Sequence, residues 1–214
     1  MSPRHRPPTG SASERPATHP SGSGLRERRK AQTRRTIQEH ALRLFLSKGY
    51  DATTVAEIAS AADVSHMTFF RYFPSKEAVV ESDDYDPLLV GLIENRPSEE
   101  GPLSALRNAV ADGLSRIYAT DRDALLARTR LILHTPALRA RMGTNLVATE
   151  DLFAAALAAR LHSDVTLEIR VIAAAALATL TTALTAWVDG DGVEDLPSLV
   201  DDAFDVLTHL SAEG

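Results

Sequence analysis

The side chains best suited to molecular recognition in this 214-residue sequence lie in residues 65–76, which read Ser-His-Met-Thr-Phe-Phe-Arg-Tyr-Phe-Pro-Ser-Lys. A short helix with this spacing turns Val64, Phe69 and Phe73 toward a core and leaves hydrogen-bonding and aromatic groups outside. That arrangement is typical of a helix that reads base edges in the DNA major groove. The predicted base contacts are His66, Met67, Thr68 and Phe70, although Phe70 is equally suited to core packing.

Further groups are placed to hold the DNA backbone. Thr54 stands at the start of a predicted helix, whose unpaired N–H groups and positive dipole end favour a phosphate. Tyr72 and Lys76 fall at the end of one helix and the start of the next, where phosphates would pass. Basic side chains of the N-terminal region add affinity that does not depend on sequence. The full predicted DNA-contacting set is Arg34, Thr54, Ser65, His66, Met67, Thr68, Phe70, Tyr72 and Lys76.

Two short helices must position these groups. Thr54-Val-Ala-Glu57 has the form of a capping box, so a helix is expected to begin there. Asp63 and Val64 would make the following turn, and Ser65 can cap the next helix. Pro74 ends that helix. An earlier helix, with an apolar stripe from Ile37 to Phe45, would complete the small domain and end at Gly49 in a left-handed cap.

These spaced residues resemble the N-terminal domain of the TetR family of transcriptional repressors. The resemblance implies a two-domain, all-α homodimer in which each subunit places its third helix in the major groove. Two departures stand out: Asp63 replaces the usual turn glycine, and Phe70 replaces a frequent tyrosine. The matching elements are Ala41-Leu-Arg-Leu-Phe45, Gly49-Tyr50, Thr53-Thr54-Val55, Ile58-Ala59, Ala62-Asp-Val64-Ser65, Thr68 and Tyr72-Phe73-x-x-Lys76.

The charge distribution agrees with a DNA-facing N-terminal part. Residues 1–76 hold 13 Lys/Arg and 6 Asp/Glu, whereas residues 77–214 hold 10 and 23. A basic tail on an acidic enzyme is the alternative explanation. The predicted organisation is a disordered basic tail over 1–24, a helix-turn-helix domain over 25–74 and a larger helical domain over 75–214.

Cytoplasmic localisation is expected, because the chain has no cysteine and no apolar signal segment at its start. The helices expected after residue 75 span 75–95, 102–119, 121–134, 136–162, 165–189 and 195–211. Pro87 is expected to bend or split the first of these. Residues 171–188 carry no charge, but their seven alanines and four threonines favour a buried helix over a membrane span. By the family resemblance, the last two helices form the homodimer interface.

The C-terminal half shows no nucleotide-binding, hydrolase or metalloprotease motif, so we predict neither an enzyme nor a bound cofactor or metal. The acidic run at 83–86 is expected to be a solvated turn or helix cap. A small-molecule effector would instead bind between helices. For each predicted ligand contact, ordinary core packing or a structural hydrogen bond is the more common role; the set is Tyr118, Arg128, Leu131, Met142, Asn145, Thr149, Phe153 and Trp187.

Two further segments, 83–89 and 145–151, are similar to a TetR subgroup that includes regulators of mycofactocin gene clusters. This resemblance implies an acyl-CoA or other lipophilic effector and an apolar tunnel with a basic mouth near Arg128, Arg139 or Arg141. The resulting hypothesis is a repressor that an effector releases from a palindromic operator. An all-α small-molecule enzyme and a protein-binding adaptor are the alternatives. The sequence leaves open the effector, the operator and the direction of regulation.

Overall fold

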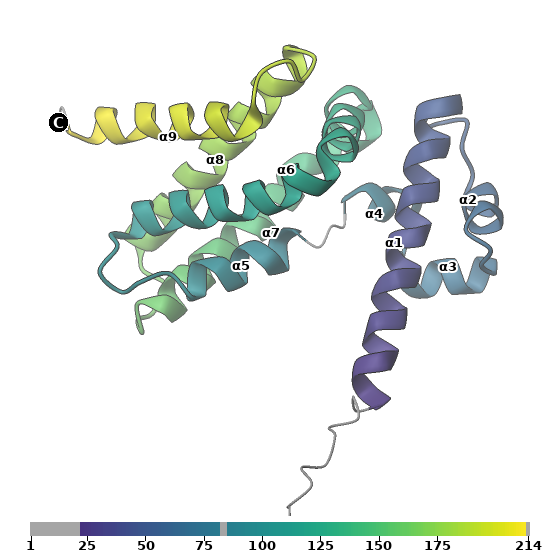
Figure 1. The fold of residues 1–214 in the computed structure, drawn as a ribbon, viewed down its shortest axis with the longest axis horizontal. Coiled ribbons are helices and arrows are strands. Elements are labelled where there is room, and N and C mark those ends of the chain that lie inside the picture. Colours follow the sequence, from purple (N-terminus) through teal and green to yellow (C-terminus); the bar gives the residue numbers. More distant parts are fainter. Residues whose placement is uncertain (1–21, 82–84, 213–214) are drawn as a thin grey trace, which may run out of the picture. The chain divides into compact units, whose positions relative to one another are not determined.

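A computed structural model describes residues 22–81 and 85–212 of the chain, and over these residues it contains nine helices and no strand (Figure 1). The predicted all-α fold is therefore confirmed. The helices are α1 (Gly22–Lys48), α2 (Val55–Ala61), α3 (His66–Tyr72), α4 (Lys76–Glu81), α5 (Tyr85–Glu94), α6 (Pro102–His134), α7 (Pro136–Arg160), α8 (Leu167–Asp189) and α9 (Leu196–Ala212).

Most helix boundaries lie close to the predicted ones, and two breaks have clear causes. The stretch expected at 75–95 is divided into α4 and α5. Pro87 lies in the first turn of α5, where a missing N–H costs no helical hydrogen bond. The two helices expected on either side of residue 120 are joined as α6, but Asp121 departs from helical geometry at φ −131° and ψ 24°. The predicted break at Asp121 is therefore present as a kink.

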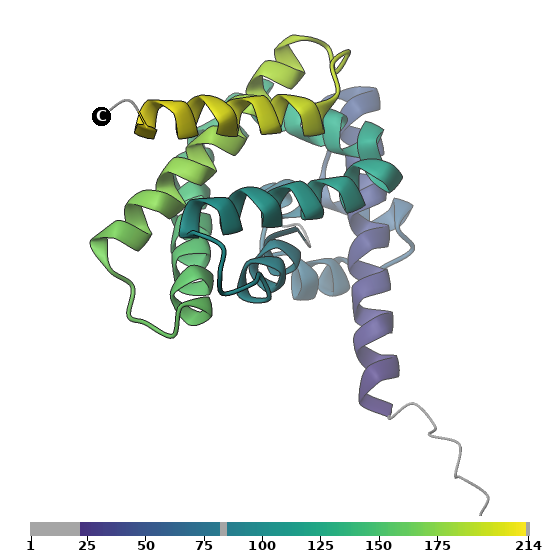
Figure 2. The same ribbon diagram turned by 60° about the vertical axis from the view of Figure 1, so that its left-hand side comes forward.

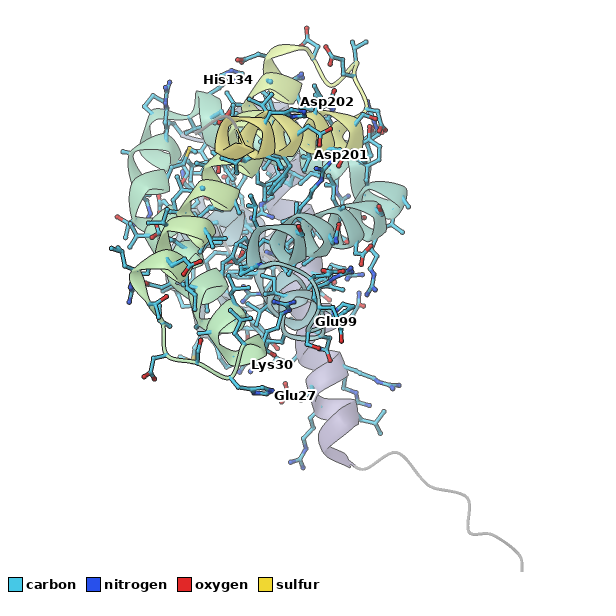
Figure 3. All side chains as sticks on the ribbon, turned by 90° about the vertical axis from the view of Figure 1, so that its left-hand side faces the viewer. Glu27, Lys30, Glu99, His134, Asp201 and Asp202 are labelled. Carbon is cyan, nitrogen blue, oxygen red and sulfur yellow. The ribbon has the colours of Figure 1, made fainter. Side chains whose placement is uncertain are left out.

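The chain divides into a first unit, residues 1–35, and a second unit, residues 36–214. In the first unit the described residues form the N-terminal part of α1, where Thr33 Oγ1 donates to the carbonyl oxygen of Arg29 at 3.0 Å. Glu27 and Lys30 are exposed on this part of the helix (Figure 3). The predicted disordered tail lies outside the described residues up to residue 21, and α1 already begins at Gly22.

Two residues with positive φ shape the turns before α2 and α3. Gly49 has φ +91°, and its N–H donates to the carbonyl oxygen of Phe45 at 3.0 Å, which confirms the left-handed helix cap. Asp63 has φ +52° in the turn between α2 and α3. Aspartate tolerates this region better than most residues do. The turn is therefore formed although the family's usual glycine is absent.

The second unit contains two hydrophobic cores. The smaller core joins Ile37, Ala41 and Phe45 of α1 to residues of α2, α3 and α4, and also includes Leu138 of α7. The larger core lies among α5, α6, α7, α8 and α9 (Figure 1). Polar bonds reinforce it, since Arg107 of α6 donates to the carboxylates of Asp201 and Asp205 on α9. Figure 3 shows Asp201 on that helix.

Helix α8 is apolar but has helical neighbours along its length. Among the described residues it alone is long and apolar enough to cross a membrane, a test that buried helices of soluble proteins also pass. It packs against α6, α7 and α9, and Figure 2 shows α9 crossing it. Thr181 and Thr185 each donate a hydroxyl hydrogen to the carbonyl four residues earlier at 2.8 Å. These contacts fit the predicted packed helix.

Candidate DNA-binding helix and effector cavity

Helix α3 is anchored by its cap and by two phenylalanines. The Ser65 hydroxyl oxygen accepts from the Thr68 N–H at 3.0 Å, which satisfies one of the unpaired donors in the first turn. The side chains of Phe69 and Phe73 have no exposed surface, and their ring centroids lie 6.0 Å apart. Val64 is half-buried beside them. The predicted buried face is thus confirmed.

The opposite face of α3 carries the predicted base-reading residues. Met67 is 83% exposed and Phe70 is 44% exposed, and His66 is also exposed. The rings of His66 and Phe70 meet edge to face, with centroids 4.8 Å apart. Phe70 makes a similar edge contact with Phe69 at 5.4 Å. These contacts hold the Phe70 ring in place while one side of it remains open to a partner.

Thr68 and Tyr72 are half-buried and less open than their neighbours. The Ser65 hydroxyl donates to Thr68 Oγ1 at 2.9 Å, so the two predicted contacts are linked to each other. Arg71 was missing from the predicted set. It is exposed one turn after Met67, and its guanidinium lies 5.5 Å from the centre of the Tyr72 ring. Counting the helical spacing from Phe69, which places Arg71 opposite the buried face, would have identified it.

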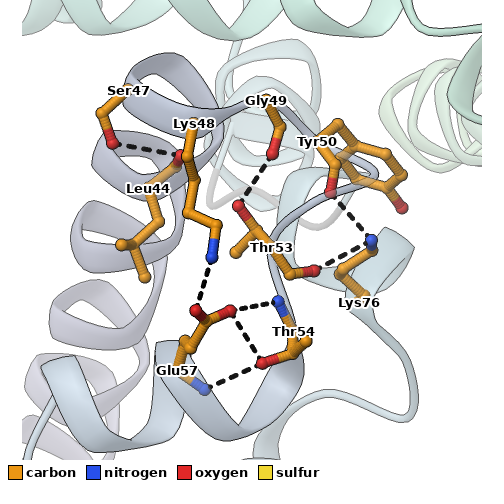
Figure 4. A network of polar contacts seen from close by, with 9 residues as sticks. All are labelled: Leu44, Ser47, Lys48, Gly49, Tyr50, Thr53, Thr54, Glu57 and Lys76. Atoms are coloured by element: carbon orange, nitrogen blue, oxygen red, sulfur yellow. Dashed lines mark hydrogen bonds and ion pairs between the residues drawn. The ribbon is translucent and has the colours of Figure 1, made fainter.

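The start of α2 holds the Glu57 carboxylate beside Thr54, the residue predicted to contact a phosphate. Thr54 N donates to Glu57 Oε2 at 2.8 Å, and Thr54 Oγ1 accepts from Glu57 N at 3.3 Å (Figure 4). This reciprocal pair confirms the predicted capping box. Lys48 forms an ion pair with the same carboxylate, and the bonds from Lys48 and Thr54 lower the pKa of Glu57 to about 2. A phosphate approaching Thr54 would therefore meet a negative charge.

Lys76 has a structural role within the protein, and its predicted phosphate contact stays a prediction. Its ammonium group donates to the backbone carbonyls of Tyr50 at 2.9 Å and Thr53 at 3.1 Å (Figure 4). It also lies 4.1 Å from the centre of the Tyr50 ring. Tyr50 in turn donates to Glu77 Oε1 at 2.8 Å, and burial together with this bond raises its pKa. The start of α4 is thus tied to the segment that precedes α2.

Arg34, the remaining predicted DNA contact, lies on α1 within the first unit of the chain. That unit is described by itself, so its relation to α3 stays a prediction. The acidic run at 83–86 falls partly outside the described residues. Over residues 22–81 and 85–212, no group of three or more His, Cys, Asp or Glu side chains is placed to hold a metal ion.

A cavity of about 250 Å³ lies among the C-terminal helices and the end of α4. Its wall contains five of the eight predicted ligand contacts, and most of the remaining wall is aliphatic. Asn145, Thr149, Thr181 and Thr185 place polar groups on two facing helices. The lining residues are Glu81, Tyr85, Asp86, Leu89, Val110, Leu114, Ile117, Leu125, Arg128, Thr129, Ile132, Leu133, Leu138, Met142, Asn145, Leu146, Thr149, Phe153, Leu177, Leu180, Thr181, Leu184 and Thr185.

Three predicted ligand contacts, Tyr118, Leu131 and Trp187, lie outside the wall of this cavity. Leu131 packs against the smaller core beneath the helix-turn-helix segment. Trp187 is 1% exposed, and its indole N–H donates to the carbonyl oxygen of Glu194 at 3.0 Å. Tyr118 packs on Trp187, with ring centroids 6.0 Å apart, and accepts from Arg122 Nε at 3.0 Å. All three side chains therefore make packing contacts or hydrogen bonds within the protein.

Charged groups gather where the cavity meets α4. Arg128 lines the cavity, and its Nε donates to the carbonyl oxygen of Val80 at 2.7 Å while Nη2 donates to that of Glu81 at 3.3 Å. The Glu81 carboxylate also lines the cavity and accepts two bonds from Arg141, at 2.5 and 3.1 Å. Two arginines from different helices therefore hold the C-terminal end of α4.

Apolar contacts make the same connection. Leu138 of α7 is 1% exposed, belongs to the core beneath the helix-turn-helix segment, and also lines the cavity. Ile132 of α6 packs against that core and lines the cavity as well. A molecule that fills the cavity would touch side chains that also support α1 to α4.

Two family models match the chain. One, described as "Bacterial regulatory proteins, tetR family", matches residues 37–82, and the other, described as "MftR C-terminal domain", matches residues 100–211. The chain is 36% identical to the HTH-type transcriptional regulator TcmR of Streptomyces glaucescens over 148 residues, 66% of each chain. It is 30% identical over 186 residues to the Mycobacterium tuberculosis protein named as mycofactocin biosynthesis transcriptional regulator MftR, covering 84% of this chain and 91% of that protein.

Solved structures share the fold. FadR of Thermus thermophilus, a TetR family transcriptional repressor crystallised in complex with lauroyl-CoA, is 27% identical with a TM-score of 0.52 over 82% of this chain and 93% of its own. FadR of Bacillus subtilis with stearoyl-CoA is 21% identical with a TM-score of 0.54, over 80% and 96% of the respective chains. The named relatives are regulators, which excludes the enzyme alternative.

Proposed function

Because the chain belongs to the TetR family of bacterial transcriptional regulators, we propose that it is a repressor that a small apolar effector releases from its operator. Two α3 helices of a homodimer would enter successive major grooves of a pseudo-palindromic site. The exposed face of α3 supports this role, because Phe69 and Phe73 are fully buried while Met67 and Phe70 stay exposed. The effector would occupy the cavity among α4 to α8.

One observation carries the proposal: the cavity wall and the supports of the DNA-binding helices share side chains. Arg128 lines the cavity and donates to the backbone of α4, while Leu138 lines the cavity and fills the smaller core. At its other end, α4 is tied to the segment before α2 through Lys76. A cavity ligand that displaces Arg128 would therefore disturb the element that leads to the helix-turn-helix.

Energy coupling sets the condition for release. An effector shifts the protein toward the DNA-incompetent state only if it binds that state more tightly than the DNA-competent one. Arg128 offers such a difference, since its two bonds to α4 can be kept or exchanged when the cavity is filled. The coupling would be reciprocal, so bound operator DNA would weaken effector binding by the same factor.

The homodimer would form through α8 and α9, as the family resemblance implies. Exposed positions on α8, among them Val171, Ala178, Thr182 and Ala186, fall on one side of the helix. Their small side chains allow another helix to approach closely. On α9, Val206 is 61% exposed and would join the same interface.

The cavity favours an effector whose buried part is uncharged. Aliphatic side chains cover most of the wall, whereas Glu81 and Asp86 place carboxylates at the α4 end. Arg128 also lines this end but already donates to the carbonyl oxygens of Val80 and Glu81, so an anionic group buried there would face the two carboxylates. The lauroyl-CoA bound to T. thermophilus FadR supports an acyl-type effector. Its acyl chain would lie in the cavity and its phosphates outside, near the exposed Arg139 and Arg141.

The test measures DNA binding by the full-length protein, with fluorescence anisotropy of a labelled duplex from the region upstream of its gene as the readout. We expect binding that weakens steeply as salt rises, and release on addition of lauroyl-CoA but not of coenzyme A alone. Absence of salt-dependent DNA binding would overturn the proposal. An adaptor, in contrast, would bind a protein partner and keep that partner after replacement of Thr68 and Tyr72.

A pair of arginine variants tests whether Arg128 couples effector binding to operator release. Arg128→Met should keep the thermal stabilisation by lauroyl-CoA but reduce the effect of that ligand on operator affinity about tenfold. Arg130→Met is the control, because Arg130 lies on the same helix and pairs with Asp191 at 2.9 Å, away from α4. Equal release of both variants from DNA would show that Arg128 does not transmit the signal.

A further inference from the structure

The outward face of α3 carries two apolar side chains that the fold does not need. Met67 is 83% exposed and Phe70 is 44% exposed, whereas Phe69 and Phe73 fill the core of the domain. Keeping large apolar groups in water brings no folding stability, so a contiguous pair is informative. Because they are three residues apart on one helix, Met67 and Phe70 are neighbours on its surface.

The pair is partly fixed before any partner arrives. The Phe70 ring is held between the buried Phe69, at 5.4 Å, and His66, at 4.8 Å, both in edge-to-face contacts. A side chain fixed in this way loses little conformational entropy on binding. Phe70 therefore offers a preformed apolar edge, and the unbranched Met67 can adapt beside it.

The polar side chains beside this pair have partners within the helix. The His66 ring packs on Phe70, the Thr68 hydroxyl oxygen accepts from Ser65, and the Arg71 guanidinium lies 5.5 Å from the centre of the Tyr72 ring. In the major groove, thymine alone presents a methyl group, at C5, whereas the other bases offer mainly hydrogen-bond donors and acceptors there. Covering those polar atoms with Met67 or Phe70 would leave them unsatisfied at a cost.

We infer that Met67 and Phe70 read thymine methyl groups, so that each operator half-site carries a thymine opposite each of these two side chains. The inference rests on the proposed DNA-binding function and adds the base that the helix selects. DNA is the partner that the charge favours, since residues 1–76 hold 13 Lys/Arg and 6 Asp/Glu. Arg71, at the other end of the helix, is left for a guanine or a phosphate.

The experiment replaces single thymines by deoxyuridine, which removes the C5 methyl and leaves base pairing unchanged. An operator is first selected from random duplexes with the full-length protein, and each thymine of one half-site is then substituted in turn. We expect two positions at which deoxyuridine weakens binding about fourfold, the effect of one buried methyl group. Met67→Ala should abolish the penalty at one position and Phe70→Ala at the other.

The controls separate this inference from folding and from the wider function. Val147→Ala removes a side chain that is 59% exposed on α7, and it should leave the whole deoxyuridine profile unchanged. Unaltered thermal unfolding of Met67→Ala would show that the fold is intact. Operator binding with no deoxyuridine penalty, or penalties that persist in both variants, would overturn methyl readout. No binding to any duplex would instead overturn DNA binding itself and favour a protein partner.

Discussion

The DNA-binding helices and the effector cavity are built in opposite ways. Helices α2 and α3 have only seven residues each, yet side-chain hydrogen bonds fix both starts. Helices α6 and α7 have 33 and 25 residues and begin at prolines without a side-chain cap. Their packing surrounds a cavity of about 250 Å³. The helices proposed to bind DNA are thus fixed by local side-chain hydrogen bonds, whereas the helices around the cavity are held mainly by apolar packing.

The contrast also shows where the two regions meet. Lys76 secures the start of α4 to the DNA-binding side, and Arg128 secures its end to the cavity side. A well-packed region transmits displacement, whereas a region with a cavity can absorb it. We therefore expect substitutions to have larger effects on stability around α2 and α3 than on the cavity wall.

The largest effect is expected from truncating the anchor of α3. Phe69→Ala should lower the free energy of unfolding by about 3–5 kcal/mol, because it removes a fully buried ring from a packed core. Met142→Ala on the half-buried cavity wall should cost clearly less. Urea denaturation of both variants measures the difference. Equal losses would contradict the proposed contrast between the two regions.

Lys76→Met tests the bonds that join α4 to the DNA-binding side. Losing hydrogen bonds from a charged donor should destabilise the protein by about 1.5–3 kcal/mol. The slope of log operator affinity against log salt should stay the same if Lys76 touches no phosphate. A slope smaller in magnitude by about 0.9 would show that Lys76 contacts a phosphate, as expected from the sequence.

Enlarging a side chain should destabilise the packed core of the DNA-binding helices more than the cavity wall. Ala59→Leu in the smaller core should cost about 1–3 kcal/mol, since Ala59 is 3% exposed and has no space to grow into. Leu146→Phe should change the free energy of unfolding by less than about 1 kcal/mol, because its ring enters the cavity, and should weaken lauroyl-CoA binding. Thermal unfolding with and without lauroyl-CoA measures both variants. A strongly destabilised Leu146→Phe would show that the cavity has no room for the larger ring.

The smallest effect concerns the capping box and depends on pH. Folding lowers the pKa of Glu57 from its ordinary 4.5 to about 2, so its stabilisation is complete above pH 4.5 and is lost as the pH falls toward 2. Glu57→Gln should remove this part of the pH dependence. Urea midpoints measured at pH 6 and pH 3 give the comparison. A variant that loses as much stability as the parent protein between these values would assign the effect to other carboxylates.

The sequence predicted the DNA-binding half better than the cavity. The capping box, the Gly49 cap and the burial of Phe69 and Phe73 follow from signals only a few residues apart, and all are present. Arg71 was overlooked although its helical position was readable. The structural bonds of Lys76 were not anticipated, because its partners, Tyr50 and Thr53, lie more than 20 residues away.

Trp187 and Leu131 show why the cavity was harder to predict. Both have the size and polarity of ligand-contacting residues, yet one is held by Glu194 and the other supports the DNA-binding core. Helical periodicity tells which side of a helix is apolar but not which neighbour covers it. Assigning a wall residue requires knowing how five helices cross.

By itself, the sequence determined the all-α fold, the helix-turn-helix and the residues that α3 turns outward, because caps, turns and helical spacing are local properties. The tertiary structure alone decided which side chains line the cavity, that Lys76 donates to the backbone carbonyls of Tyr50 and Thr53, and that Arg128 and Leu138 connect the cavity to the DNA-binding helices. Those features depend on contacts between residues far apart in the chain, whose partners are set by packing.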